Sequence, residues 1–203
     1  MHAALRCGAN ILRMTFTPAA PPTPPFIPQI RLYQNWLARE RGLRFETYDA
    51  LWQWSVTELD AFWQSIWDYF AIQSPTPHSA ALTDDRMPQA KWFPGAQVNY
   101  AAQVLRHVEA AHAAGMAAII SENEIAQVRE LSWPDLKSQV ASLAISLREM
   151  GVERGDRVAA YMPNIPETIV ASLACMSIGA VWSVCAPDMG TPAVLDRFKQ
   201  ITP

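Results

Sequence analysis

Three apolar segments late in the sequence follow one another in a regular order. Residues 157–162 form an apolar run of strand length, and the Pro-Asn-Ile-Pro sequence at 163–166 cannot continue a strand because two of its residues lack an N–H. Residues 168–178 are apolar or small on every side, which predicts a helix that is covered all round and ends at Gly179. Residues 180–185 form a second apolar run. A strand, a crossover helix and a strand predict a right-handed βαβ unit of a parallel sheet, and so an α/β fold class.

Upstream of this unit, apolar side chains recur at helical spacing. The strongest stripe runs from Leu59 to Phe70; it is typical of a packing face, with a cofactor or lipid surface as the alternative. Three other segments, 30–41, 99–114 and 136–150, and a last one at 191–200, also predict helices. The predicted inner-face residues are Ile30, Tyr33, Trp36 and Leu37; Leu59, Phe62, Trp63, Ile66, Trp67 and Phe70; Val104, Leu105 and Val108; and Leu136, Val140, Leu143, Leu147 and Met150.

Polar residues mark the starts of these helices. Asn99 can cap the helix that runs to about residue 114. Capping boxes are predicted at three further starts, for Ser55 with Glu58, Ser132 with Asp135, and Asn164 with Glu167. Residues 117–121 and 128–133 flank an acidic turn and predict a strand pair, whereas 74–91 predicts a polar loop.

Composition and charge narrow the class of protein. The chain has 203 residues, of which 50% are hydrophobic and 17% charged, so it can bury a core. Its net charge of −3, without a basic block, argues against nucleic-acid binding. Residues 168–187 carry no charge over about the thickness of a bilayer, but the break at Gly179 favours a buried helix and strand over a membrane span. We therefore expect neither a nucleic acid nor a membrane as partner.

Cysteines and histidines show no spacing typical of a disulfide framework or a metal site. Cys7, Cys175 and Cys185 are widely separated, which fits a reducing, cytoplasmic location. His107 and His112 are five residues apart on a predicted helix and do not share a face, so we expect both at the surface.

The N-terminal residues differ in pattern from the rest. Residues 1–28 contain a Pro-rich run and predict a disordered leader, in which Met14 is the expected true start. A transit peptide over residues 1–13 and a proline-recognition ligand within the leader are the alternatives.

Several stretches resemble the adenylate-forming acyl-CoA synthetases. The turn and strand Gly-Asp-Arg-Val-Ala at 155–159, the Pro-Asn-Ile-Pro-Glu at 163–167 and the small-residue helix that ends in Gly-Ala at 179–180 are similar to the first sheet of that family. Trp-Phe-Pro-Gly-Ala-Gln-Val-Asn-Tyr-Ala at 92–101 and the aromatic stretch at 48–56 resemble the N-terminal region of acetyl- and acetoacetyl-CoA synthetases.

Two stretches resemble one branch, the acetoacetate–CoA ligases. These are Trp-Ser-Val-Cys-Ala-Pro-Asp-Met-Gly at 182–190 and Val-Leu-Asp-Arg-Phe at 194–198; the branch more usually has Ser and Phe at the positions of Ala186 and Met189. The resemblance implies an acid–thiol ligase that converts acetoacetate, ATP and CoA into acetoacetyl-CoA, AMP and pyrophosphate. An acetyl- or propionyl-CoA synthetase and a non-catalytic binding or regulatory module are the alternatives.

The resemblance also implies how the chain is organised. Beyond the leader, it implies a helical acetyl-CoA-synthetase-type region at 29–114 and an incomplete N-terminal part of the AMP-binding domain at 115–203. The family's phosphate-binding loop, nucleotide motifs and C-terminal lysine do not occur in these 203 residues. We therefore expect a truncated, inactive chain whose partners are small-molecule substrates and the remainder of the enzyme after Pro203.

The family uses ATP, Mg²⁺ and CoA in its full-length enzymes, and none of them is expected to bind this chain alone. No catalytic residue and no metal ligand is assigned within it. One local assignment carries over, because the segment after the second strand lies on the CoA side in related enzymes. That segment is Ala186, Pro187 and Asp188 here, and a simple strand-ending turn is the alternative.

Overall fold

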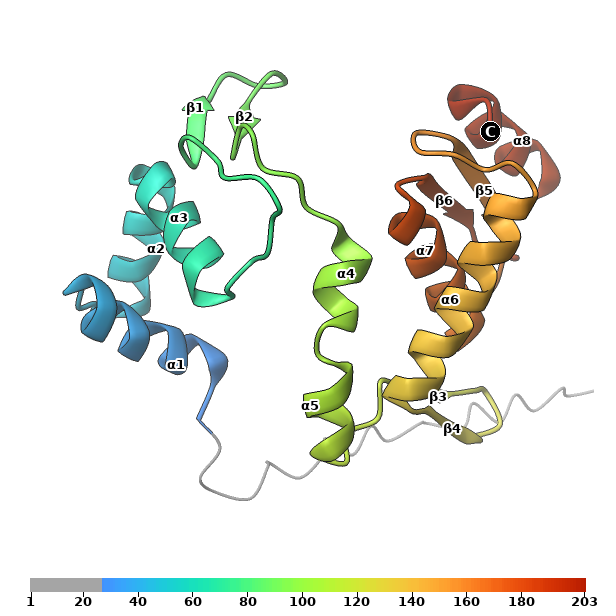
Figure 1. Cartoon of the computed structure of the whole chain (residues 1–203), viewed down its shortest axis with the longest axis horizontal. Coiled ribbons are helices and arrows are strands. Elements are labelled where there is room, and N and C mark those ends of the chain that lie inside the picture. Colours follow the sequence, from blue (N-terminus) through green and yellow to red (C-terminus); the bar gives the residue numbers. More distant parts are fainter. Residues whose placement is uncertain (1–26) are drawn as a thin grey trace, which may run out of the picture. The chain divides into compact units, whose positions relative to one another are not determined.

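The structure is a computed structural model of the chain in which residues 27–203 are described (Figure 1). The predicted leader, apart from Ile27 and Pro28, and the proposed start at Met14 lie outside these residues. The chain divides between Leu51 and Trp52 into two units. Helices dominate the earlier part, and short strands, including one parallel pair, follow, which confirms the mixed α/β class.

In the first unit, α1 (Gln29–Trp36) continues into a π-helical turn, η1 (Leu37–Arg41). Together they confirm the helix predicted over 30–41. Gly42 ends it with φ +69°, a left-handed conformation that costs glycine little. The predicted inner face is only partly buried. Tyr33 is buried, whereas Ile30 is 44% exposed.

The boundary between the units lies within α2 (Tyr48–Thr57), and α3 (Leu59–Tyr69) follows in the second unit. The predicted capping box of Ser55 and Glu58 is wrong. Ser55 lies inside α2, where its hydroxyl donates to the carbonyl oxygen of Trp52 at 2.7 Å. Glu58 is the N-cap residue of α3 and makes no side-chain capping bond.

The aromatic stripe of α3 packs on the segment that follows it, which confirms a packing role. The ring of Trp67 lies 4.6 Å from that of Phe93, and Trp63 meets Trp92 edge-to-face at 5.5 Å, both measured between centroids. The burial is incomplete, because Trp63 is 39% and Phe70 53% exposed. The predicted loop contains a short antiparallel pair that the prediction missed, β1 (Leu82–Asp84) with β2 (Lys91–Trp92).

Asn99 joins two helices that are far apart in sequence. Its Oδ1 accepts from the backbone N–H of Ala102 at 3.0 Å, which confirms the predicted cap of α4 (Tyr100–Leu105). Its Nδ2 also donates to the carbonyl oxygens of Met176 and Ser177, at 3.0 and 3.1 Å. One side-chain amide therefore provides hydrogen-bond partners for a backbone N–H at the start of α4 and for two carbonyl oxygens at the end of another helix.

The predicted helix over 99–114 is broken after α4 and resumes as α5 (Val108–Ala113). At the break, the Arg106 guanidinium donates to the carbonyl oxygens of Phe70 and Ala71, each at 2.5 Å. These carbonyls lie just beyond the C-terminal residue of α3, where a cation also complements the helix dipole. His107 and His112 are both exposed, as predicted.

A hairpin and a long helix come next. Strands β3 (Ile119–Glu122) and β4 (Val128–Leu131) pair antiparallel, as predicted. Ser132 then caps α6 (Trp133–Glu149): its Oγ accepts from the backbone N–H of Asp135 at 3.2 Å and donates to that residue's carboxylate at 2.6 Å. Of the predicted inner face of α6, Leu136, Val140 and Leu147 are buried. Leu143 is partly buried, and Met150, the C-cap residue, is 69% exposed.

The predicted βαβ unit consists of β5 (Arg157–Tyr161), α7 (Pro166–Ile178) and β6 (Val181–Cys185), followed by α8 (Thr191–Ile201). The two strands pair parallel, with the Cα atoms of residue 157 opposite 181 and of residue 161 opposite 185. Helices α6 and α7 pack together beside this sheet (Figure 1). The main core forms there, from Ala101, Leu136, Val140, Ala144, Leu147, Val170, Leu173, Ala174, Cys175 and Ala180.

Two expectations about α7 are wrong. The N-cap position is Ile165 rather than Asn164, because the helix begins with Pro166 at its first position, and no side chain caps it. Glu167 instead forms an ion pair with Arg129 at 2.6 Å. The helix is also not covered all round, since Ile169 is 40% exposed.

The charge-free stretch at 168–187 is a helix followed by a strand, as predicted. Within residues 27–203, no helix combines the length and the hydropathy that crossing a bilayer would require.

Candidate functional site

The carboxyl ends of β5 and β6 lie side by side, and the chain leaves both strands at the same edge of the sheet. In open parallel sheets, ligands bind in the crevice outside this edge. The loop that follows β6 therefore lies where a ligand would bind. It includes the three residues predicted for the CoA side.

Ala186, Pro187 and Asp188 lie together in a tight turn and are all exposed. The backbone N–H of Met189 donates to the carbonyl oxygen of Ala186 at 3.1 Å, which closes the turn with proline at its second position. Gly190 is then the N-cap residue of α8. The turn presents Asp188 to solvent.

Tyr161, at the end of β5, is a residue of this site that the sequence reasoning missed. Its hydroxyl lies 2.5 Å from the carbonyl oxygen of Pro187 and 2.8 Å from that of Met189. These two carbonyls flank Asp188 in the chain. The predicted parallel pairing could have indicated this residue. In a parallel pair, the last residue of one strand lies near the loop that leaves the other.

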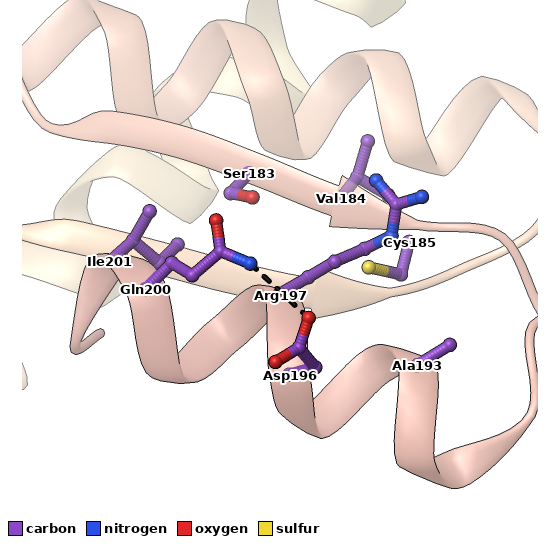
Figure 2. A pocket seen from close by; sticks show the side chains of 8 residues that line it. All are labelled: Ser183, Val184, Cys185, Ala193, Asp196, Arg197, Gln200 and Ile201. Carbon is purple, nitrogen blue, oxygen red and sulfur yellow. Dashed lines mark hydrogen bonds between the residues drawn. The ribbon is translucent and has the colours of Figure 1, made fainter.

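An open cleft of about 500 Å³ adjoins the turn, between β6 and α8 (Figure 2). Arg197 extends from α8 toward the end of β6, while Asp196 accepts a hydrogen bond from Gln200 at 3.3 Å. The lining residues are Ser183, Val184, Cys185, Ala193, Asp196, Arg197, Gln200 and Ile201. The predicted residues 186–188 do not line it, so the cleft and the turn are neighbours rather than one cavity.

A second open cleft, of about 750 Å³, lies beside Asn99 and the end of α7. Arg154 is the one charged residue in its lining. Neither cleft gathers the paired carboxylates, nucleophile or cation cluster that phosphoryl or acyl transfer needs. Among residues 27–203, no three His, Cys, Asp or Glu side chains are grouped so that they could hold a metal ion.

Two pKa shifts in the βαβ unit arise from contacts that hold the fold together. A hydrogen bond from Arg129 lowers the pKa of Glu167 and ties β4 to the start of α7. Burial raises the pKa of the Cys175 thiol, which favours its unreactive protonated form. Cys185 is buried as well.

Comparison with known proteins identifies the family. Residues 48–104 match the family described as acetyl-coenzyme A synthetase N-terminus, and residues 105–203 match the family described as AMP-binding enzyme. The chain is 41% identical over 169 residues to an acetoacetyl-coenzyme A synthetase of Rhizobium meliloti (strain 1021), an alignment that covers 83% of this chain and 25% of the relative. It is 37% identical over 179 residues to an acetoacetyl-CoA synthetase of Xenopus tropicalis, covering 87% of this chain and 26% of that one.

A solved structure is also similar. The acetoacetyl-CoA synthetase from Streptomyces lividans is 44% identical and superposes with a TM-score of 0.78, over 85% of this chain and 26% of that chain. The chain thus spans about a quarter of the length of the relatives it matches. It belongs to the AMP-binding, adenylate-forming acyl-CoA synthetases and is a homologue of the N-terminal portion of acetoacetyl-CoA synthetase.

Proposed function

We propose that the protein containing this chain is an ATP-dependent acetoacetate–CoA ligase. The observation that carries this proposal is the similarity of 41–44% identity, over more than four fifths of the chain, to proteins described as acetoacetyl-CoA synthetases. The reaction joins acetoacetate to the thiol of CoA through an acyl-adenylate, with release of pyrophosphate and AMP. Membership of the AMP-binding family supports the use of ATP.

Within that enzyme, this chain supplies scaffold and one edge of a ligand site rather than the reacting groups. In this proposal the chain consists of a helical region at 29–114 and the start of the AMP-binding domain at 115–203. The turn of Ala186, Pro187 and Asp188 faces CoA, supported by its position outside the carboxyl ends of a parallel strand pair. The residues described here do not fit Mg²⁺, and we assign none of them to it.

The proposed partner is the polypeptide that corresponds to the remaining three quarters of the relatives. Parallel sheets are stable when both faces and their strand edges are covered. Val181 and Val184 on β6 and Leu195 on α8 are between 44% and 51% exposed. Such exposed apolar side chains are suited to contact with additional strands and helices.

ATP–pyrophosphate exchange tests the function, because it reports adenylate formation before CoA takes part. We expect the natural translation product that contains this chain to show exchange that depends on acetoacetate, and to release AMP once CoA is added. Acetate and propionate serve as the competing acids. Faster exchange with either would favour the acetyl- or propionyl-CoA alternative, and no exchange with any acid would favour a non-catalytic module.

The isolated 203-residue chain is the matched control. We expect it to be poorly soluble and to show no exchange, since its described residues, 27–203, hold no cluster of groups suited to positioning ATP. Exchange above background by this chain alone would contradict the assignment of the reacting groups to another part of the protein.

A further inference from the structure

We propose that Tyr161 is a positioning residue for CoA: its hydroxyl fixes the turn that presents Ala186, Pro187 and Asp188. This inference rests on the proposed function, because it takes these three residues as the CoA side of the site. Tyr161 itself does not reach the reacting atoms in this proposal, and it acts through the backbone of the turn.

The geometry of the hydroxyl carries the argument. It lies 2.5 Å from the carbonyl oxygen of Pro187 and 2.8 Å from that of Met189. One phenolic O–H has a single proton, so it donates to one carbonyl or is shared between the two. One of these carbonyls belongs to the peptide that precedes Asp188 and the other to the peptide that follows Met189, so the same donor orients the backbone before and after Asp188.

The turn closes without this contact, so Tyr161 has an effect on orientation rather than on turn formation. The hydrogen bond from Met189 N–H to the Ala186 carbonyl already closes the turn, and the N–H of Met162 holds the carbonyl of Cys185 at 3.0 Å. Phenylalanine at position 161 would leave two carbonyl oxygens pointing to the same place without a donor between them.

A side chain at the start of β5 contacts the backbone just after α8. Arg157, which begins β5, donates from its Nε and a terminal nitrogen to the carbonyl oxygen of Thr202, at 3.0 and 2.9 Å. Side chains at both ends of β5 therefore fasten the stretch from the turn through α8. Tyr161 is the contact of the two that lies next to the residues proposed for CoA.

The test uses the natural translation product that contains this chain, with Tyr161→Phe and the control Tyr100→Phe. Tyr100 is 62% exposed at the start of α4 and lies outside the turn, so its variant also removes an exposed hydroxyl. For Tyr161→Phe we expect acetoacetate-dependent pyrophosphate exchange within about twofold of the unmodified protein. The KM for CoA should rise about 2- to 12-fold, the loss of one net hydrogen bond.

Two further measurements separate positioning from a general loss of structure. Hydrogen exchange of the amides at 188–190 should accelerate in Tyr161→Phe and stay unchanged in Tyr100→Phe. Replacement of Tyr161 by p-aminophenylalanine restores a donor with two N–H groups, and it should return the KM for CoA toward the original value.

The possible failures are distinguishable. A KM for CoA that rises no more in Tyr161→Phe than in Tyr100→Phe overturns the inference, as does an equal loss of exchange and of ligation. If the unmodified protein shows no exchange with any acid, the proposed function fails and the CoA role of Tyr161 fails with it. Hydrogen exchange at 188–190 then still decides whether Tyr161 holds the turn.

Discussion

Replacing Asn99 by aspartate separates the two sets of hydrogen bonds that this side chain makes. Aspartate is about as good an N-cap as asparagine, so the bond from the Ala102 N–H should survive the change. The carboxylate has no N–H to give to the carbonyls of Met176 and Ser177, which it would instead repel. Alanine at the same position removes both sets of bonds.

The expected costs follow from these contacts. Each bond from the amide to a carbonyl contributes a net of about 0.5–1.5 kcal/mol, so Asn99→Asp should lower the free energy of unfolding by about 1–3 kcal/mol. Asn99→Ala adds the loss of the cap, about 1 kcal/mol, for a total of about 2–4 kcal/mol. Ser132→Ala is the matched control, because Ser132 caps α6 through local contacts alone, and its cost should be about 1 kcal/mol.

Urea unfolding followed by tryptophan fluorescence measures these differences. Hydrogen exchange of Gly179 and Ala180, just beyond the carbonyls that Asn99 holds, reports the same contact locally. The reasoning is refuted if Asn99→Asp unfolds within about 0.5 kcal/mol of the unmodified chain, or if Asn99→Ala costs no more than Ser132→Ala, values that are resolved by this method.

Three further changes have expected outcomes. Leu173→Ala, at a site only 4% exposed in the main core, should cost about 2–5 kcal/mol in urea unfolding, and a cost below 1 kcal/mol would show that the core collapses around it. Gly95→Ala should lower the thermal midpoint, because glycine has φ +94° there and an added Cβ would lie 2.8 Å from the Pro77 carbonyl oxygen; an unchanged midpoint would contradict this. Glu167→Gln should cost at most about 1 kcal/mol at pH 7, since its ion pair with Arg129 is exposed. Because that pair lowers the pKa of Glu167, its contribution is present above the ordinary carboxyl pKa and is lost as the pH falls through the lowered value, so the two chains should converge in acid and in high salt.

Local patterns predicted most of the fold, and the failures have physical reasons. The parallel unit and the cap at Ser132 depend on residues close in sequence, and the structure has them where they were expected. Asn164 failed as a cap because Pro166 is suited to the first helical position, which makes Ile165 the cap residue. Proline geometry therefore outweighed the preference of asparagine for the cap.

The candidate site depends on contacts that periodicity does not contain. Tyr161 reads as an ordinary strand residue, and its hydroxyl gains a role only when β6 and the following turn are placed beside it. Trp63 shows the opposite error. It lies on the helical stripe and its ring contacts Trp92 of β2 edge-to-face, but the side chain remains 39% exposed. Helical spacing therefore predicted more burial than the fold supplies.

The two-helix contact of Asn99 has a consequence for synthesis on the ribosome. The residue and its carbonyl partners are separated by 77 and 78 positions, so the amide is made well before the helix end that it holds. At about 5–20 residues per second, the delay is about 4–15 s. During that interval α4 has its cap but lacks its second anchor, and the N-terminal helices must wait for the parallel unit before this junction closes. A pause in translation between codons 99 and 177 would lengthen the interval in which the apolar face of α4 is open to other chains.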